Sequence, residues 1–131
     1  MNKIFAAMAV AALALTGTQA AAQTRMEKNE ARLAEMLEGR VAGDPQPCVS
    51  ALRSSDIEVL EYIGIVYDAG DTIWVARARD PRSLGTNDVP IIDRFGSQLC
   101  RHDVIRTIDR GSHFTTGAVF LDDFVPYTKQ G

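Results

Sequence analysis

The chain has 131 residues, of which 46% are hydrophobic and 24% charged, and it carries a formal net charge of −3. This length fits one domain and is too short for two separate cores, while the supply of Val, Ile and aromatic residues excludes a disordered chain. The slight acidity gives no indication of a polyanionic partner such as nucleic acid.

Residues 1–22 have the three regions of a secretory signal peptide. Lys3 gives a positive start, residues 4–15 form an unbroken apolar run, and small alanines precede a cleavage position between Ala22 and Gln23. Twelve apolar residues make only about 18 Å of helix, too short for a hydrocarbon layer of ~30 Å. We therefore expect a cleaved leader and a single mature domain over residues 23–131, located in the periplasm or secreted, without a membrane span.

The mature chain is predicted to open with one amphipathic helix over residues 24–38. Thr24 and Glu27 fit a capping box, and Met26, Leu33 and Leu37 recur on one helical face. Gly39 follows where a left-handed cap is common. Residues 39–56 then form a connector, because the two prolines and the glycine of 40–48 exclude a helix or a central strand.

Two cysteines, Cys48 and Cys100, lie in the mature part. An even cysteine count in an exported chain predicts a disulfide. A zinc pair is the first alternative, although structural zinc sites prefer closely spaced cysteine pairs. The second alternative is a catalytic thiol at Cys100 with His102 as its base.

Several short segments resemble a group of small exported alphaproteobacterial proteins that have no assigned function. The segments are 37–45 followed by Cys48, and then 65–68, 97–100 and 124–127. The resemblance implies an extracytoplasmic compartment, a disulfide and a compact domain. It implies no catalytic residues.

From Ile57 onward the pattern changes to short β-type runs separated by turns. Residues 63–67 and 72–78 flank a glycine-containing connection, which predicts a hairpin, and residues 79–88 read as a surface loop. Pro90 and Pro126 are expected at sheet edges. The candidate strands are 57–60, 63–67, 72–78, 89–95, 104–109, 118–121 and 124–127. We therefore predict a mainly β fold over residues 57–127: a small antiparallel barrel or sandwich of six to seven strands, with one N-terminal helix and one disulfide.

Groups that could carry chemistry are few. His102 and His113 are the histidines of the chain, and Asp103, Asp109, Asp122 and Asp123 are the nearby carboxylates. Two histidines and a carboxylate can hold a metal, but neither histidine has the helical spacing of a metalloprotease. Solvated or turn-capping roles explain these positions more simply, and the sequence predicts neither a metal nor a cofactor.

Arginine is concentrated in the β region. Residues 72–110 contain seven basic side chains, all arginine, and five acidic ones. Arg77, Arg79 and Arg82 form the candidate binding surface, because a guanidinium presents a fixed fork of donors to carboxylates and phosphates. A solvated sheet edge is the simpler interpretation of the same charges.

Two functions remain after these observations. The favoured one is a non-enzymatic periplasmic or envelope module that binds a protein or an anionic surface component through Arg77, Arg79 and Arg82. The alternative is a small hydrolase or metal-dependent enzyme that uses His102, His113 and nearby carboxylates.

Overall fold

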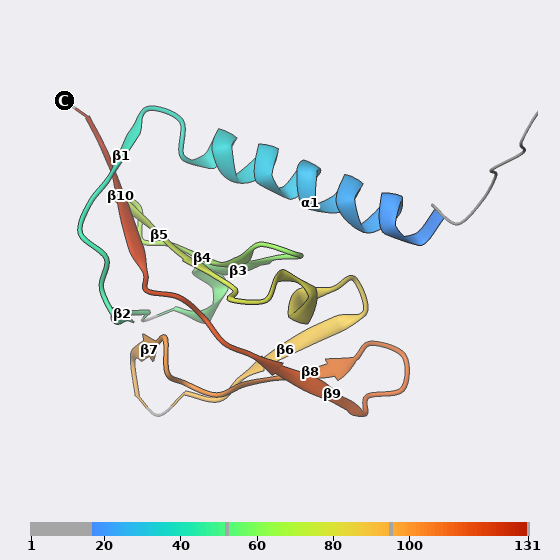
Figure 1. Ribbon diagram of the computed structural model, residues 1–131. Coiled ribbons are helices and arrows are strands. Elements are labelled where there is room, and N and C mark those ends of the chain that lie inside the picture. Colours follow the sequence, from blue (N-terminus) through green and yellow to red (C-terminus); the bar gives the residue numbers. More distant parts are fainter. Residues whose placement is uncertain (1–16, 52, 95, 131) are drawn as a thin grey trace, which may run out of the picture.

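The computed structural model describes residues 17–51, 53–94 and 96–130 (Figure 1). These residues form one α-helix and ten β-strands in three antiparallel sheets. Figure 1 shows a layered arrangement, in which the helix α1 (Gly17–Met36) lies over one face of a five-stranded sheet and the two smaller sheets lie on the opposite side. The mainly β prediction is confirmed, but the strands are more numerous than expected and the three sheets do not close into a barrel.

The central sheet has the order β1–β10–β5–β4–β3, and the smaller sheets have the orders β2–β7 and β6–β8–β9. The strands of the central sheet are β1 (Arg40–Ala42), β3 (Ile57–Leu60), β4 (Gly64–Asp68), β5 (Thr72–Arg77) and β10 (Val125–Lys129). The other strands are β2 (Cys48–Ser50), β6 (Asp88–Ile92), β7 (Gln98–Cys100), β8 (Ile105–Asp109) and β9 (Thr115–Val119). Two 3-10 turns, η1 (Ser54–Asp56) and η2 (Pro81–Leu84), complete the elements.

The predicted hairpin is confirmed as β4 and β5. Gly70 adopts a φ of 89° in the turn, which a residue with a side chain rarely adopts, and its N–H donates to the carboxylate of Asp68. Gly64 is required for a different reason, since a Cβ there would lie 2.1 Å from the carbonyl oxygen of Ala76 on β5. Glycine therefore sets both the turn and the close pairing of the two strands.

Both faces of the central sheet are buried, each by a different partner. Leu33 of α1 is 2% exposed and packs with Val66, Ile73 and Val75 on one face. The other face carries Ile65 and Ala76, which join a larger cluster with Val49, Leu99, Ile105, Val119 and Phe124. Strand β4 is accordingly buried along almost its whole length. This larger cluster, on the face away from α1, is the common core of all three sheets.

The helix differs from its prediction in its bounds and agrees in its buried face. It begins at Gly17 and not at Thr24, and it ends at Met36 rather than residue 38. Met26, Met36 and Leu37 pack beside Leu33 against the central sheet, as the apolar periodicity predicted. The expected signal peptide lies mostly outside the described residues. No helix in the described ranges is long and apolar enough to cross a membrane.

The two proline predictions have different outcomes. Pro90 lies on β6, which is an outer strand of its sheet, as expected. Pro126 was expected at an edge, and this is wrong, because β10 lies between β1 and β5. The carbonyl of Pro126 accepts from the N–H of Gly43 at 2.7 Å. The backbone polar groups of Pro126 therefore face the β1 side of β10, next to Gly43 and one residue beyond the last β1 pair. Because they do not face β5, the absence of an N–H on Pro126 costs no hydrogen bond to β5.

The loop prediction for residues 79–88 is partly confirmed. This segment contains η2, whose Asp80 caps the turn by accepting from the N–H of Arg82. Leu84, at the end of η2, is 1% exposed and belongs to the common core. The segment is therefore an anchored turn whose polar side alone faces solvent.

Candidate functional site

The three arginines of the candidate binding surface do not act as one group. Arg77 forms two hydrogen bonds to the carboxylate of Glu30 on α1, at 2.6 and 3.2 Å. Hydrogen bonding to Glu30 is the main cause that raises the pKa of Arg77. Arg77 therefore links the helix to the central sheet, and two donors of its guanidinium are already engaged by Glu30.

Arg79 precedes η2 and Arg82 lies within it, and each contacts a different carboxylate. Arg79 lies 3.4 Å from the carboxylate of Asp122, and the Arg82 guanidinium contacts Asp80 at 3.1 Å. All four side chains are more than half exposed, so each contact is a surface ion pair. The bond to Asp80 raises the pKa of Arg82, and the same contact lowers the pKa of Asp80.

A hollow of about 380 Å³ lies beside Arg79. Arg79, Asp80 and Ser83 line it from the η2 segment, and Ala118 and Phe120 line it from β9 and the residue after it. Phe120 is 57% exposed although it is a large apolar side chain. The backbone fixes its position, because the Phe120 carbonyl accepts from the Arg79 N–H at 2.9 Å. Arginine, an exposed aromatic ring and a shallow concavity therefore meet at one place.

Sequence reasoning did not include Phe120 in this surface. The only indication was its place within the predicted strand 118–121, between Val119 and Leu121, which are both buried in the structure. Strand alternation turns every second side chain away from the core, so a phenylalanine between two buried residues is directed outward. Phe114, at the other end of β9, is 76% exposed.

His102 lines a second open cleft, of about 800 Å³. The cleft lies between the end of β6 and the start of β8, and its other lining residues are Ile92, Asp93, Arg94, Asp103, Val104 and Arg106. Arg106 contacts Asp93 at 2.8 Å, and Arg94 donates to the Ala51 carbonyl. Val104 is 62% exposed and contributes apolar surface.

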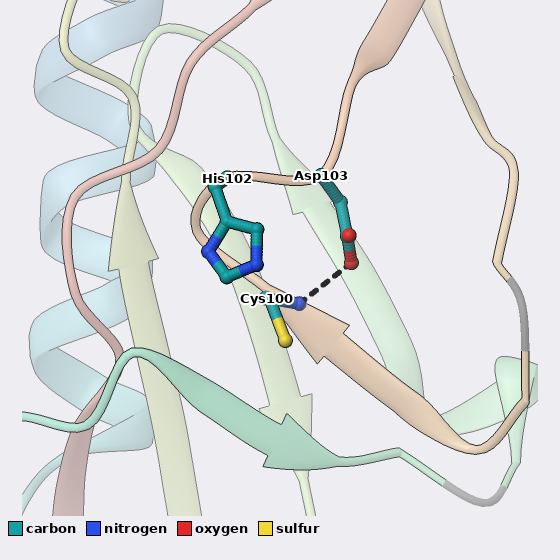
Figure 2. Close-up of side chains that lie close together, drawn as sticks. All are labelled: Cys100, His102 and Asp103. Carbon is teal, nitrogen blue, oxygen red and sulfur yellow. Dashed lines mark hydrogen bonds between the residues drawn. The ribbon is translucent and has the colours of Figure 1, made fainter.

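His102 belongs to a tight turn that follows β7 (Figure 2). The N–H of Asp103 donates to the Cys100 carbonyl at 3.1 Å, and the Cys100 N–H donates to the Asp103 carboxylate at 2.7 Å. Figure 2 shows the imidazole of His102 and the carboxylate of Asp103 both directed from the turn toward Cys100. One ligand atom of each residue lies within 4.8 Å of those of the other two.

The cysteine of this cluster is oxidised. Cys48 and Cys100 form a disulfide with their Cα atoms 4.0 Å apart, which confirms the predicted bond. They lie directly opposite each other in the β2–β7 ladder. The flanking bond from the Arg101 N–H to the Pro47 carbonyl marks them as a non-hydrogen-bonded pair, the closer of the two antiparallel pair types. A disulfide sulfur is not a thiolate, so neither a zinc pair nor a catalytic thiol exists in this state.

His113 lies away from His102. The five residues of β8 separate the two histidine-bearing turns, a length of about 16 Å of extended chain. His113 has a positive φ of 61° in the β8–β9 turn and is exposed. The structure therefore does not bring the two histidines together, and no metal-type cluster among the described residues contains His113.

The carboxylates near the histidines serve local contacts. Asp109 accepts from the N–H groups of Gly111 and Ser112 and from the Ser112 hydroxyl. The bonds from Ser112 are the main cause that lowers the pKa of Asp109. Asp123 contacts Arg101 at 2.9 Å, as Asp122 contacts Arg79. Asp109 therefore caps a turn, as the simpler interpretation predicted, whereas Asp122 and Asp123 pair with surface arginines, which the sequence did not predict.

Comparisons of the chain with protein families, with curated proteins and with solved structures find no match.

Proposed function

We propose that this protein is an exported, non-enzymatic module that binds a partner in the cell envelope through Arg79, Arg82 and Phe120. The observation that carries the proposal is the hollow beside η2, which Arg79 and the exposed Phe120 line together, with the exposed Arg82 nearby in sequence on η2. Aromatic and arginine side chains are enriched in protein interfaces, and aromatic anchors with arginine dominate many binding energies. We call this group the Arg79–Phe120 surface.

The present ion pairs do not prevent binding. Exposed pairs such as Arg79 with Asp122 contribute about 0–1 kcal/mol each, so a partner carboxylate can replace one at small cost. Arg77 is different, because its two bonds to Glu30 connect α1 to the central sheet. Of the three arginines predicted to bind a partner, Arg79 and Arg82 therefore remain candidates, and Arg77 has a structural role.

A protein partner suits this surface better than a simple polyanion. Phe120 adds apolar area that a phosphate group would leave exposed, whereas a protein can cover it while offering carboxylates to the arginines. Nucleic acid is disfavoured by the net negative charge of the chain. We infer a partner with an acidic rim around an apolar side chain.

The compartment is part of the same proposal. The signal-like N-terminus supports export, and a disulfide is the bond expected in an oxidising compartment. The proposed location is the periplasm or the exterior. The resemblance to small exported alphaproteobacterial proteins supports the same compartment.

A second candidate function is a small hydrolase or metal-dependent enzyme centred on His102. The favouring observation is that His102 and Asp103 line an open cleft. The separation of His113 removes one of the groups that this candidate needs. A His102→Ala variant that retains the partner of the wild type favours the binding module, and one that loses a hydrolytic activity favours the enzyme.

The binding proposal is tested by recovering the tagged protein from the envelope with its partners. The Arg79→Ala/Arg82→Ala and Phe120→Ser variants are each expected to lose a partner that the wild type retains. Arg110→Ala is the matched control, since Arg110 is an exposed arginine outside this surface. Equal recovery with all variants would overturn the assignment of the surface.

A further inference from the structure

We propose that reduction of the Cys48–Cys100 disulfide creates a zinc site, with Cys48, Cys100, His102 and Asp103 as its four ligands. This site lies apart from the Arg79–Phe120 surface and does not depend on the binding function. In Figure 2 an imidazole and a carboxylate converge on Cys100, one half of the disulfide.

The positions of the ligand atoms suit a tetrahedral ion. Zinc bonds of 2.0–2.3 Å place the ligand atoms of one site about 3–4 Å from each other. The Cys100 sulfur and the ligand atoms of His102 and Asp103 already lie within 4.8 Å of one another. Movements of about 1 Å therefore close the site around an ion. The Cys48 sulfur does not belong to that 4.8 Å group, but it is bonded to the Cys100 sulfur and so stays next to the site after reduction, where we assign it as the fourth ligand.

The backbone that holds the cysteines does not depend on the disulfide alone. The ladder bonds from Arg101 to Pro47 and from Ala51 to Ser97 are both 2.8 Å and flank the β2–β7 pair. The turn from Cys100 to Asp103 has its own two bonds. After reduction these contacts keep the two cysteines opposite each other, with His102 and Asp103 beside them.

Reduction supplies the ligands that the oxidised state lacks. A dithiol transfers two electrons and two protons to the sulfur–sulfur bond, which breaks to give two cysteine thiols, while the dithiol becomes a disulfide. Zinc then binds both cysteines as thiolates, and their two protons leave to solvent. Two thiolates, an imidazole and a carboxylate are a donor set that zinc accepts. A small-molecule disulfide reverses the sequence: it accepts two electrons and two protons and becomes a dithiol, while the Cys48–Cys100 bond re-forms and the ion is released.

The surroundings also suit a divalent cation. The His102 imidazole is exposed and makes no hydrogen bond or ion pair with the described residues, so binding of an ion breaks no such bond. One oxygen of Asp103 accepts from the Cys100 N–H, which orients the carboxylate and leaves its other oxygen for an ion. Arg94 and Arg106 line the cleft with Asp93 and Asp103. The two arginines and the two aspartates of the cleft cancel in charge. Two thiolates then give the site a net charge of −2, which the 2+ charge of the zinc ion neutralises.

The test is a titration of the purified protein with Zn²⁺ alone. The protein is compared in its oxidised form and after reduction by a dithiol, which is then removed under nitrogen. We expect one zinc per reduced chain and no comparable binding by the oxidised chain. His102→Ala and Asp103→Asn should each weaken binding to the reduced chain at least tenfold, and His113→Ala, the matched control, should leave it unchanged.

Circular dichroism of each sample shows whether the reduced chain keeps its β structure. If the reduced chain unfolds, zinc is expected to restore the fold in the wild type and in His113→Ala, but not in His102→Ala. Zinc held only by the two thiols of an unfolded chain would bind equally in all variants, and that result overturns the proposal. Absence of binding by the reduced chain, or equal binding by the oxidised chain, overturns it as well.

Discussion

Replacing both disulfide cysteines by alanine should remove a large share of the stability of the domain. The bond joins residues 52 positions apart, and closing a loop of this length contributes about 4 kcal/mol in the chain-entropy model. The β2–β7 ladder remains in the variant, so we expect the free energy of unfolding to fall by about 2–4 kcal/mol. Natural domains have only about 5–15 kcal/mol in total, which makes this loss easy to measure.

The assay is urea unfolding of the purified protein, followed by tryptophan fluorescence from Trp74. Reducing agent provides an internal control, because the reduced wild type should unfold at nearly the same urea concentration as Cys48→Ala/Cys100→Ala. Ser50→Ala, an exposed change in the same β2 strand, should have little effect. A double variant as stable as the oxidised wild type would refute the view that the bond constrains the unfolded chain.

Three further predictions concern other parts of the chain. N-terminal sequencing of exported protein should begin at Gln23, and an intact Met1 in the envelope fraction would contradict cleavage. Leu33→Ala should lower the free energy of unfolding by about 2–5 kcal/mol, because this side chain is 2% exposed between α1 and the central sheet; urea unfolding measures the change. The folded pKa of Asp109 lies below its unfolded pKa. The hydrogen bonds of its carboxylate therefore stabilise the folded protein above the unfolded pKa, and this stabilisation is lost as the pH falls through the lower folded pKa. An NMR titration should show Ser112→Ala raising this pKa, and an unchanged value would contradict the assigned hydrogen bonds.

Local patterns predicted the elements whose causes lie close together in sequence. The β4–β5 hairpin depends on Gly70 and its flanking apolar runs, and Ile57–Leu60 forms a strand at the predicted bounds. Strands β1, β2 and β7 have three residues each, too few for an apolar period to appear. Their pairing comes from distant contacts, such as that of Cys48 with Cys100. The division of the strands into three sheets and their order were therefore beyond the sequence patterns, although the mainly β class was not.

The candidate surfaces show the same division. The arginines at 77, 79 and 82 were visible as a charge cluster, but the partner of Arg77 is Glu30, 47 residues earlier, and only the fold reveals it. The exposure of Phe120 depends on the buried side of β9. His102 was named beside Cys100 from its spacing, and Asp103 was named only as a carboxylate near the histidines. Their convergence on the disulfide depends on the hydrogen bonds of the turn.

The most direct test of the proposed function is photo-crosslinking in the envelope from position 120. A photoreactive residue replaces Phe120 in one variant and the exposed Gln98, on a different sheet, in another. The account predicts a discrete crosslinked species from position 120 that disappears when Arg79 and Arg82 are changed to alanine. No species from position 120, or the same species from position 98, would contradict a binding function for the Arg79–Phe120 surface.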